Sequence, residues 1–290
     1  MAEKFASSSA KAQKPVKHEK HLNDRIREKA ISFVKKRLSA LKDVELFPAP
    51  MAINPLDDDG DGDPDDRNLV ENTKDFPWKS ICLLKLFSAE NKLIGTGTGW
   101  FVGPNTIITA AHNLYDPDEN EITEKITLIP GCAGEQEPFQ SISIDHTHFR
   151  IPSGFIEKET IEMDYAAIIL PNNLFKVKMG FFGLACLYSK SLKNLSVKIS
   201  GYPGEKVPAN MQWYHQGRIA SIDDNGFSLG YTIDTSPGQS GSPVWYENDE
   251  GEYHVVGIHS EGYYHKNFAI RFTERVFDQI LEWREEGMPS

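Results

Sequence analysis

From about Leu69 onward, the chain is a series of short apolar runs separated by turn residues. The turn residues recur at fairly regular intervals, a pattern typical of a β-sandwich or β-barrel rather than of alternating strands and helices. The runs are SICLLKLF, NTIITAA, KITLI, YAAIIL, SVKISGY, SPVWY and HVVGIHS. We therefore expect residues 69–290 to form one all-β domain.

One segment near the C-terminus has a different period. Between Thr273 and Trp283, apolar residues recur at three- and four-residue steps, which is the spacing of a helix. These residues are Val276, Phe277, Ile280, Leu281 and Trp283. The spacing predicts a single C-terminal helix that docks on the domain.

The N-terminal part differs in composition from the rest of the chain. Residues 1–21 are polar and of low complexity, which predicts a disordered tail. Residues 22–52 contain an amphipathic helix from Leu22 to Leu41 with Lys and Arg on its outer face. A basic face suits a membrane or a calmodulin-like partner. Because single amphipathic helices usually pack on their own protein, we favour a packed helix or a propeptide.

Residues 53–68 form an acidic linker with the spacing of a calcium-binding loop. Alternating aspartates and a glycine at the sixth position supply the oxygen cage and the sharp turn that Ca²⁺ requires. The candidate ligands are Asp57, Asp59, Asp61, Asp63 through its carbonyl, Asp65 and Asn68. The twelfth position holds Asn68 instead of a bidentate Glu, which predicts weaker binding. The stretch also resembles the thrombospondin type 3 calcium repeats, and the alternative is a solvated acidic linker.

The formal net charge of −11 excludes some classes of partner. Nucleic acid and anionic membrane both require a basic face, so we expect neither. No apolar run approaches the roughly 18 residues of a membrane span, and the N-terminus lacks the apolar centre of a secretory signal. Cys82, Cys132 and Cys186 are too few, and odd in number, for a disulfide framework. We expect them to be buried apolar side chains.

The segment DTSPGQSGSPVW, residues 234–245, places hydroxyl and turn residues directly before an apolar run. It is either a turn between strands or a loop that presents Ser240 as a nucleophile among amides that bind an oxyanion. A serine nucleophile needs an imidazole base and a carboxylate that orients it. His112 follows one apolar strand and Asp164 precedes another. Each alone is usually structural, but together they occur in a known triad order.

Longer motifs extend this pattern over about residues 66–283. They are TGWFVGPNTIITAAH, MDYAAIIL, SGYPGEKVPANMQWYHQGRI, GQSGSPVW and GIHSEG. With these motifs the sequence resembles the chymotrypsin-fold serine proteases, and more closely the bacterial glutamyl endopeptidases of the V8-like group. The resemblance implies two antiparallel six-stranded β-barrels with the triad in the cleft between them. It also implies hydrolysis of protein or peptide substrates through an acyl-enzyme, with no cofactor for catalysis.

The resemblance assigns roles to the residues that match the family motifs. His112 is implied as the general base, Asp164 as its orienter and Ser240 as the nucleophile. The amides of Gly238 and Ser240 are implied as the oxyanion hole.

Other matched positions line the substrate. Thr235 and His259 fall where the family obtains its preference for Glu or Asp at P1. An imidazole and a hydroxyl donate hydrogen bonds to a carboxylate without burying a full charge. Ser260 and Gly262 are implied to line the substrate backbone and to pair with it as a strand.

The sequence departs from the family pattern in four places. Glu261 adds a negative charge beside the expected subsites, and Gln239 stands where the trypsin branch has Asp, so activation by an amine–Asp pair is unavailable. The cysteine pair that flanks the His strand in some relatives is absent here, and Thr98 and Asn113 stand near those places. Secreted members also use their mature N-terminus in the pocket. Here the preceding residues predict either a precursor cleaved within about 45–67 or a pocket without the amine.

Two alternatives remain at this point. A catalytically silent protease fold that serves as a binding module would also keep these motifs, because a fold does not define a function. The resemblance favours secretion, whereas the missing signal sequence and disulfide framework leave an intracellular location open. Calcium in the acidic linker would order it and gate activity. The sequence defines neither the oligomeric state nor the physiological substrate.

Overall fold

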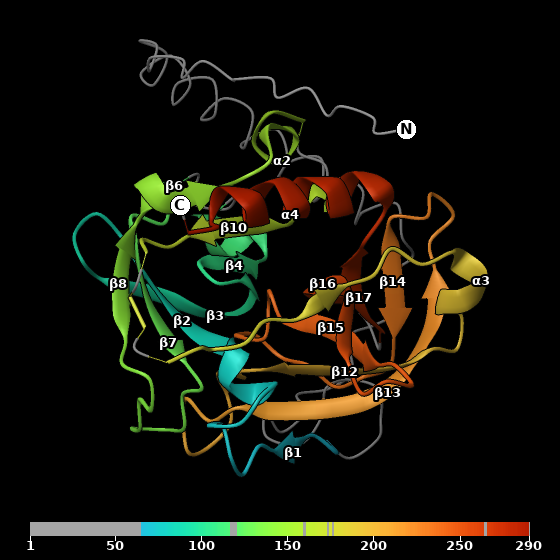
Figure 1. The fold of residues 1–290 in the computed structure, drawn as a ribbon, viewed down its shortest axis with the longest axis horizontal. Helices are drawn as coiled ribbons and strands as arrows, with labels where there is room; N and C mark the ends of the chain where they lie inside the picture. Colours follow the sequence, from blue (N-terminus) through green and yellow to red (C-terminus); the bar gives the residue numbers. More distant parts are fainter. Residues whose placement is uncertain are drawn as a thin grey trace, which may run out of the picture.

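The computed structural model describes residues 65–116, 121–158, 161–172, 174–175, 177–263 and 266–289. The predicted tail (1–21), the predicted helical segment (22–52) and residues 53–64 of the acidic linker lie outside the described residues. Within them the chain is mostly β, with two large groups of strands side by side (Figure 1).

The first group is a seven-stranded antiparallel sheet. In spatial order its strands are β8 (Ile142–Asp145), β7 (Lys125–Pro130), β2 (Ile81–Phe87), β3 (Leu93–Gly103), β4 (Thr106–Thr109), β10 (Ala166–Ile169) and β9 (Phe149–Arg150). Over the described residues no pairing joins β8 to β9, so this sheet is a half-barrel.

The second group closes into a six-stranded barrel. Its strands in order are β13 (Trp213–Ile222), β12 (Ser196–Gly201), β15 (Pro243–Glu247), β16 (Tyr253–Tyr263), β17 (Lys266–Arg271) and β14 (Ser228–Tyr231), which pairs again with β13. Two short strands are added to it: β1 (Asn68–Leu69) on β13 and β11 (Gly183–Leu184) on β16. The predicted all-β, two-part architecture is confirmed, with one closed barrel and one half-barrel.

Short elements connect the strands. They are β5 (Tyr115–Asp116) paired with β6 (Glu121–Ile122), the 3₁₀ turns η1 (Trp78–Ser80), η2 (Ala111–Asn113), η3 (His146–His148) and η4 (Ile161–Met163), and the helices α2 (Ser153–Lys158), α3 (Ser189–Leu192) and α4 (Glu274–Glu286). The predicted C-terminal helix is α4. Thr273 caps its N-terminus by accepting a hydrogen bond from the Val276 amide.

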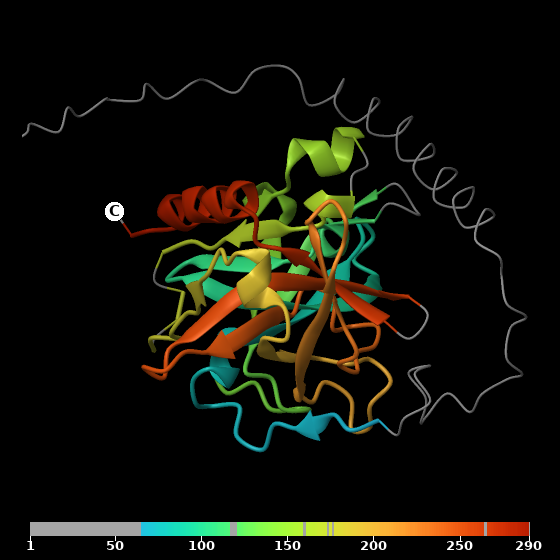
Figure 2. The ribbon, with the colours of Figure 1, turned by 90° about the vertical axis from the view of Figure 1, so that its right-hand side faces the viewer.

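The side chains of β15 and β16 contribute to the apolar cores of both halves. Successive side chains of a strand point to opposite faces. Accordingly, Val244 and Val256 lie in the barrel interior, whereas their neighbours Trp245 and Val255 lie in the core shared with the half-barrel. The α4 side chains of Val276, Ile280 and Trp283 belong to that shared core too. In Figures 1 and 2, α4 runs above the large strands and below α2.

The register of the half-barrel brings two strand ends together. Thr109, the last residue of β4, is paired with Ala166, the first residue of β10. His112 comes three residues after Thr109 and Asp164 two residues before Ala166. Because the strands are antiparallel, both side chains lie at the same edge of the sheet.

Candidate active site

His112 and Asp164 contact each other at this edge. His112 lies in the η2 turn, and its Nδ1 is 2.7 Å from Oδ2 of Asp164. The backbone amide of His112 also donates to Oδ1 of Asp164 at 2.9 Å. Two hydrogen bonds from one residue fix both the position and the orientation of the imidazole, which is the arrangement an orienting carboxylate requires.

Asp164 is ionised although it is buried. Burial alone would raise its pKa, but the charge and hydrogen bonds of His112 and the Ser260 hydroxyl outweigh that effect and hold the pKa below its usual value. Ser260 Oγ donates to Oδ2 of Asp164 at 2.5 Å. The sequence suggested Ser260 only as a substrate-lining residue, and the pattern contains no signal for this second contact, which joins positions 96 residues apart.

Ser240 lies in the loop between the barrel strands β14 and β15. Its hydroxyl donates to the carbonyl of Ser260 at 3.2 Å. Its own carbonyl accepts from the Thr98 amide and from Asn113 Nδ2, each at 2.9 Å. Thr98 and Asn113 belong to the half-barrel side, so these bonds tie the Ser240 loop to the turn that carries His112.

The backbone around Ser240 leaves two amides unpaired. Gln239 N donates to Ser236 O and Gly241 N donates to His259 O. In the part of the chain that the structure describes, the amides of Gly238 and Ser240 donate to no partner. Such alternating unpaired amides are able to bind a negatively charged oxygen.

Gly238 needs to be glycine in this loop. Its φ is +99°, a value that side chains disfavour. A Cβ at this position would lie 2.4 Å from the Tyr202 carbonyl oxygen. In addition, the Gly238 carbonyl accepts from the Thr98 hydroxyl at 2.9 Å, which fixes the peptide plane.

His259 lies behind the Ser240 loop and is 2% exposed. Its Nδ1 is 2.7 Å from the Tyr231 hydroxyl, and the imidazole also hydrogen-bonds to the backbone of Phe268. Burial lowers the pKa of His259 to about 4, so the imidazole is neutral at pH 7. Thr235, the other predicted pocket residue, is also buried.

The remaining predicted substrate residues lie on β16. The β15 pairing of β16 ends at Ile258, whereas β17 continues beside Gly262, whose partner is Asn267. Beyond Ile258, the side of β16 that faces β15 therefore has no β15 partner. This is the side on which the predicted pairing of Ser260 and Gly262 with a substrate strand would occur. Glu261 pairs with Phe268 through its backbone.

One cluster has the composition of a metal site. Asp66, His215 and Asp234 place one ligand atom each within 4.8 Å of one another. Hydrogen bonds already use these atoms: Asp234 N donates to His215 Nδ1, Asp66 N donates to Asp234 Oδ2, and His215 Nε2 is 2.9 Å from Asp66 Oδ1. The cluster therefore forms a closed hydrogen-bonded network.

The calcium-loop prediction falls mostly outside the described residues, which contain two of its candidate ligands. Asp65 binds Arg67 through both carboxylate oxygens and also Lys206. Asn68 lies in β1, and its side-chain amide donates to the Asp66 carbonyl.

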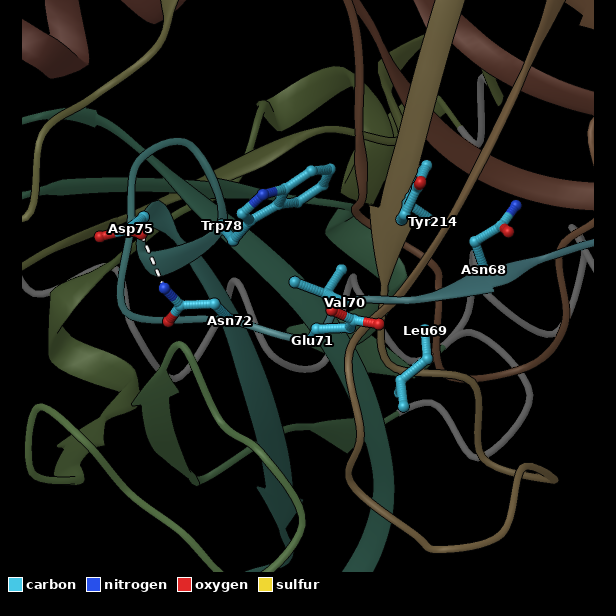
Figure 3. A pocket seen from close by; sticks show the side chains of 8 residues that line it. All are labelled: Asn68, Leu69, Val70, Glu71, Asn72, Asp75, Trp78 and Tyr214. Carbon is cyan, nitrogen blue, oxygen red and sulfur yellow. Dashed lines mark hydrogen bonds between the residues drawn. The ribbon is translucent and has the colours of Figure 1, made fainter.

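A separate groove of about 530 Å³ lies beside β1. Figure 3 shows Asn68, Leu69 and Val70 on one side of it, with Trp78 and Tyr214 across from them. The rings of Trp78 and Tyr214 are 5.1 Å apart. None of its lining residues belongs to the predicted catalytic set.

Comparison with known proteins identifies the class. Residues 97–258 match the trypsin-like peptidase domain, and this chain belongs to that family. A glutamyl endopeptidase of Bacillus licheniformis is 36% identical over 231 residues, covering 77% of this chain and 68% of the relative. An extracellular metalloprotease of Bacillus subtilis is 31% identical over 225 residues, covering 77% and 69%.

The fold agrees with that assignment. The solved structure of a Glu endopeptidase in complex with MPD superposes with a TM-score of 0.65 at 27% identity, covering 78% of this chain and 99% of that one. The chain is thus a trypsin-like serine protease related to the glutamyl endopeptidases, which confirms the predicted family and enzyme class. Among the described residues, no helix has the length and apolar character needed to cross a membrane.

Proposed function

We propose that this protein is an endopeptidase in which Ser240 is the nucleophile, His112 the general base and Asp164 the residue that orients His112. The observation that carries the proposal is the double hydrogen bond from His112 to buried, ionised Asp164, at the edge facing the Ser240 loop. Peptide substrates suit this arrangement because an acyl-enzyme needs a base, a nucleophile and an oxyanion site together.

The reaction follows from the positions of these groups. As a substrate carbonyl arrives, the Ser240 hydroxyl turns from the Ser260 carbonyl towards His112 and attacks the carbonyl carbon while His112 takes its proton. Hydrogen bonds of this kind often form only in the substrate complex. The amides of Gly238 and Ser240 receive the oxyanion, and His112 then protonates the leaving amine. Water then attacks the acyl carbon while His112 takes one of its protons. The bond to Ser240 Oγ breaks, His112 returns the proton to Oγ, and the acid product leaves.

Cleavage after Glu, with Asp as a second choice, is the specificity we propose. The support is a neutral, buried His259 held by Tyr231, with Thr235 buried on the same loop as Ser240. Donors on uncharged groups bind a carboxylate strongly, because such hydrogen bonds are charge-assisted. The relatives named glutamyl endopeptidases are consistent with this preference.

Covalent labelling tests the triad. A peptidyl phosphonate with Glu at P1 is expected to modify Ser240 stoichiometrically, as read by peptide mass spectrometry. His112→Ala should abolish labelling, whereas His148→Ala, which changes a half-buried histidine of η3, should leave it intact. Labelling that persists in His112→Ala would contradict the role of His112. A folded protein that hydrolyses no peptide would favour the binding module.

We also propose that residues 57–68 bind calcium and that an N-terminal precursor segment is released. Secretion is part of the same proposal, and the extracellular relative is consistent with it. A calcium titration that follows both Tm and hydrolysis rate tests the calcium site. Equal Tm and equal rates with and without calcium would rule out gating by this ion.

A further inference from the structure

Arg67 connects the chain entering the domain to the loop that carries Ser240. It precedes β1, yet its Nη1 donates to Ser236 Oγ at 2.7 Å and to Gln239 Oε1 at 2.9 Å. The partners are 169 and 172 residues further along the chain. Arg67 therefore contacts the residue directly before the proposed nucleophile.

The charge of Arg67 is neutralised on the other side of its guanidinium. Nη2 donates to Asp65 at 2.7 Å and to Glu205 at 2.6 Å. Burial would lower the pKa of Arg67, but these two carboxylates outweigh it and raise the pKa above its usual value. The group is thus a buried cation with one end on carboxylates and the other on neutral oxygens of the loop.

Gln239 transmits this contact to the oxyanion amides. Its Oε1 accepts from the Ser236 amide as well as from Arg67, and its own amide donates to Ser236 O. Gln239 thus lies between Gly238 and Ser240 in the chain, and both its side chain and its backbone amide are bonded to Ser236. A shift of Gln239 would rotate the peptide plane that carries the Ser240 amide and would displace Gly238, its other neighbour in the chain.

The docking of residues 65–70 brings Arg67 to this place. β1 pairs with Trp213 and Tyr214 of β13, and the Val70 amide donates to Gln212 O. Asp66 adds the contact of its backbone amide with buried Asp234. β1 lies alongside the first residues of β13, and Figure 3 shows Asn68, Leu69 and Val70 near Tyr214. The segment is therefore held on both sides of Arg67.

We propose that Arg67 is a positioning residue for the oxyanion hole, which it aligns through Gln239. The proposal rests on the proposed roles of Ser240 and the Gly238 and Ser240 amides. The planar guanidinium fork is what allows one side chain to bind two carboxylates and two loop oxygens, and the ammonium group of lysine lacks that geometry. Consequently, a processed chain has to keep Arg67, so that cleavage is confined to the N-terminal side of that residue.

The test combines kinetics with chemical rescue. Arg67→Lys and Arg67→Ala are compared with Arg271→Met, a control that removes a partly buried arginine bound to the Gly226 and Leu187 carbonyls of the same barrel. We expect kcat on a P1 Glu peptide to fall about 100-fold in both Arg67 variants with KM within about threefold, since small misplacements of catalytic groups act mainly on the transition state. Methylguanidinium should restore Arg67→Ala, and methylammonium should not.

A second readout does not depend on catalysis. In a Ser240→Ala background, hydrogen exchange of the peptide covering residues 236–242 should accelerate in Arg67→Ala but not in Arg271→Met.

The outcomes separate the two proposals. If Ser240→Ala still cleaves the peptide, the proposed nucleophile is wrong. If the wild type requires Ser240 while the folded Arg67 variants keep kcat within about twofold, the positioning role is wrong. It is equally overturned if activity loss follows Tm alone, without rescue by methylguanidinium and without faster exchange at 236–242.

Discussion

The half-barrel and the closed barrel place their shares of the site in different ways. His112 and Asp164 stand at paired strand ends, so the ladder of β4 and β10 sets their separation. Ser240 stands in a loop, and polar bonds from Arg67, Thr98 and Asn113 hold that loop from outside its own strands. His112 is fixed by a packed sheet, whereas Ser240 is fixed by a network of hydrogen bonds.

This difference has an energetic consequence. A residue in a packed sheet cannot move without disturbing the close-packed apolar core around it, so a change there costs folding stability. A loop held by hydrogen bonds of about 1 kcal/mol each can move without unfolding the domain. Changes in the Ser240 loop should therefore alter activity at constant stability more readily than changes around His112.

The largest expected effect tests the sheet side. Asp164 accepts from the His112 amide, the His112 ring and the Ser260 hydroxyl. Asp164→Asn leaves one acceptor oxygen and favours the wrong tautomer of His112, so kcat should fall about 10⁴-fold. Steady-state kinetics checks this, with the exposed cap variant Asp145→Asn as the control. A decrease in kcat of less than about tenfold would contradict the role of Asp164 in orienting His112.

A smaller effect is expected on the loop side. Gly238→Ala would force a Cβ towards the Tyr202 carbonyl at a φ of +99° and displace an oxyanion amide. We expect kcat to fall about 10²–10³-fold, with a loss of stability of about 1–3 kcal/mol. Gly251→Ala places a Cβ at a comparable positive φ, +77°, where it would meet only an ordinary contact with Glu247 Oε1 at 3.9 Å, and it therefore separates strain from catalysis. Equal kcat values in the two variants would contradict the proposed role of the Gly238 amide in the oxyanion hole.

The pocket prediction concerns discrimination rather than rate. His259→Leu removes a donor for the P1 carboxylate, and a hydrogen bond to a charged group contributes about 1.5–3 kcal/mol. The ratio of kcat/KM for P1 Glu over P1 Gln substrates should therefore fall about 10- to 150-fold. His254→Leu, on the same strand and stacked on Tyr246, is the matched control. An unchanged ratio in His259→Leu would place the specificity elsewhere.

The remaining expected effects concern the dependence of stability on pH. The pKa of His259 is lowered by burial to about 4, so below pH 6.5 the unfolded chain binds the extra proton. Stability should then fall as the pH drops from about 6.5 towards 4, by up to about 3 kcal/mol. His259→Gln should flatten this limb in chemical denaturation at each pH. An identical acid limb in the variant would contradict a neutral buried His259.

His215 should change the pH dependence of stability in the opposite direction. Burial lowers its pKa, but the hydrogen bond and charge of Asp234, with the charge of Asp66, outweigh that and raise the pKa above 6.5. Its stabilising contribution is complete below pH 6.5 and is lost as the pH rises through the folded-state value. In His215→Gln, this loss of stability with rising pH should be absent when chemical denaturation is followed at each pH.

The elements predicted from sequence are those with local signals. NTIITAA predicted the strand that became β4, and the apolar spacing after Thr273 predicted α4, because burial of one face produces a short-range period. The candidate triad was found from residues beside such strands together with the family motifs. The closure of one barrel and not of the other depends on pairing at the sheet edges, which no local period encodes.

The contacts that shape the Ser240 loop could not be predicted in the same way. Arg67 and Gln239 are 172 residues apart, and nothing in DDRN or GQSG identifies them as partners. The Ser260 hydroxyl on Asp164 and the Tyr231 hydroxyl on His259 also join distant positions. Side-chain hydrogen bonds depend on a tertiary geometry that periodicity does not contain.

The most direct test of the account is cleavage-site mapping on a mixed peptide library with wild type, Ser240→Ala and His259→Leu. The account predicts cleavage after Glu by the wild type, none by Ser240→Ala, and cleavage with weakened preference by His259→Leu. Cleavage by Ser240→Ala, or wild-type cleavage that is indifferent to an acid at P1, would contradict it.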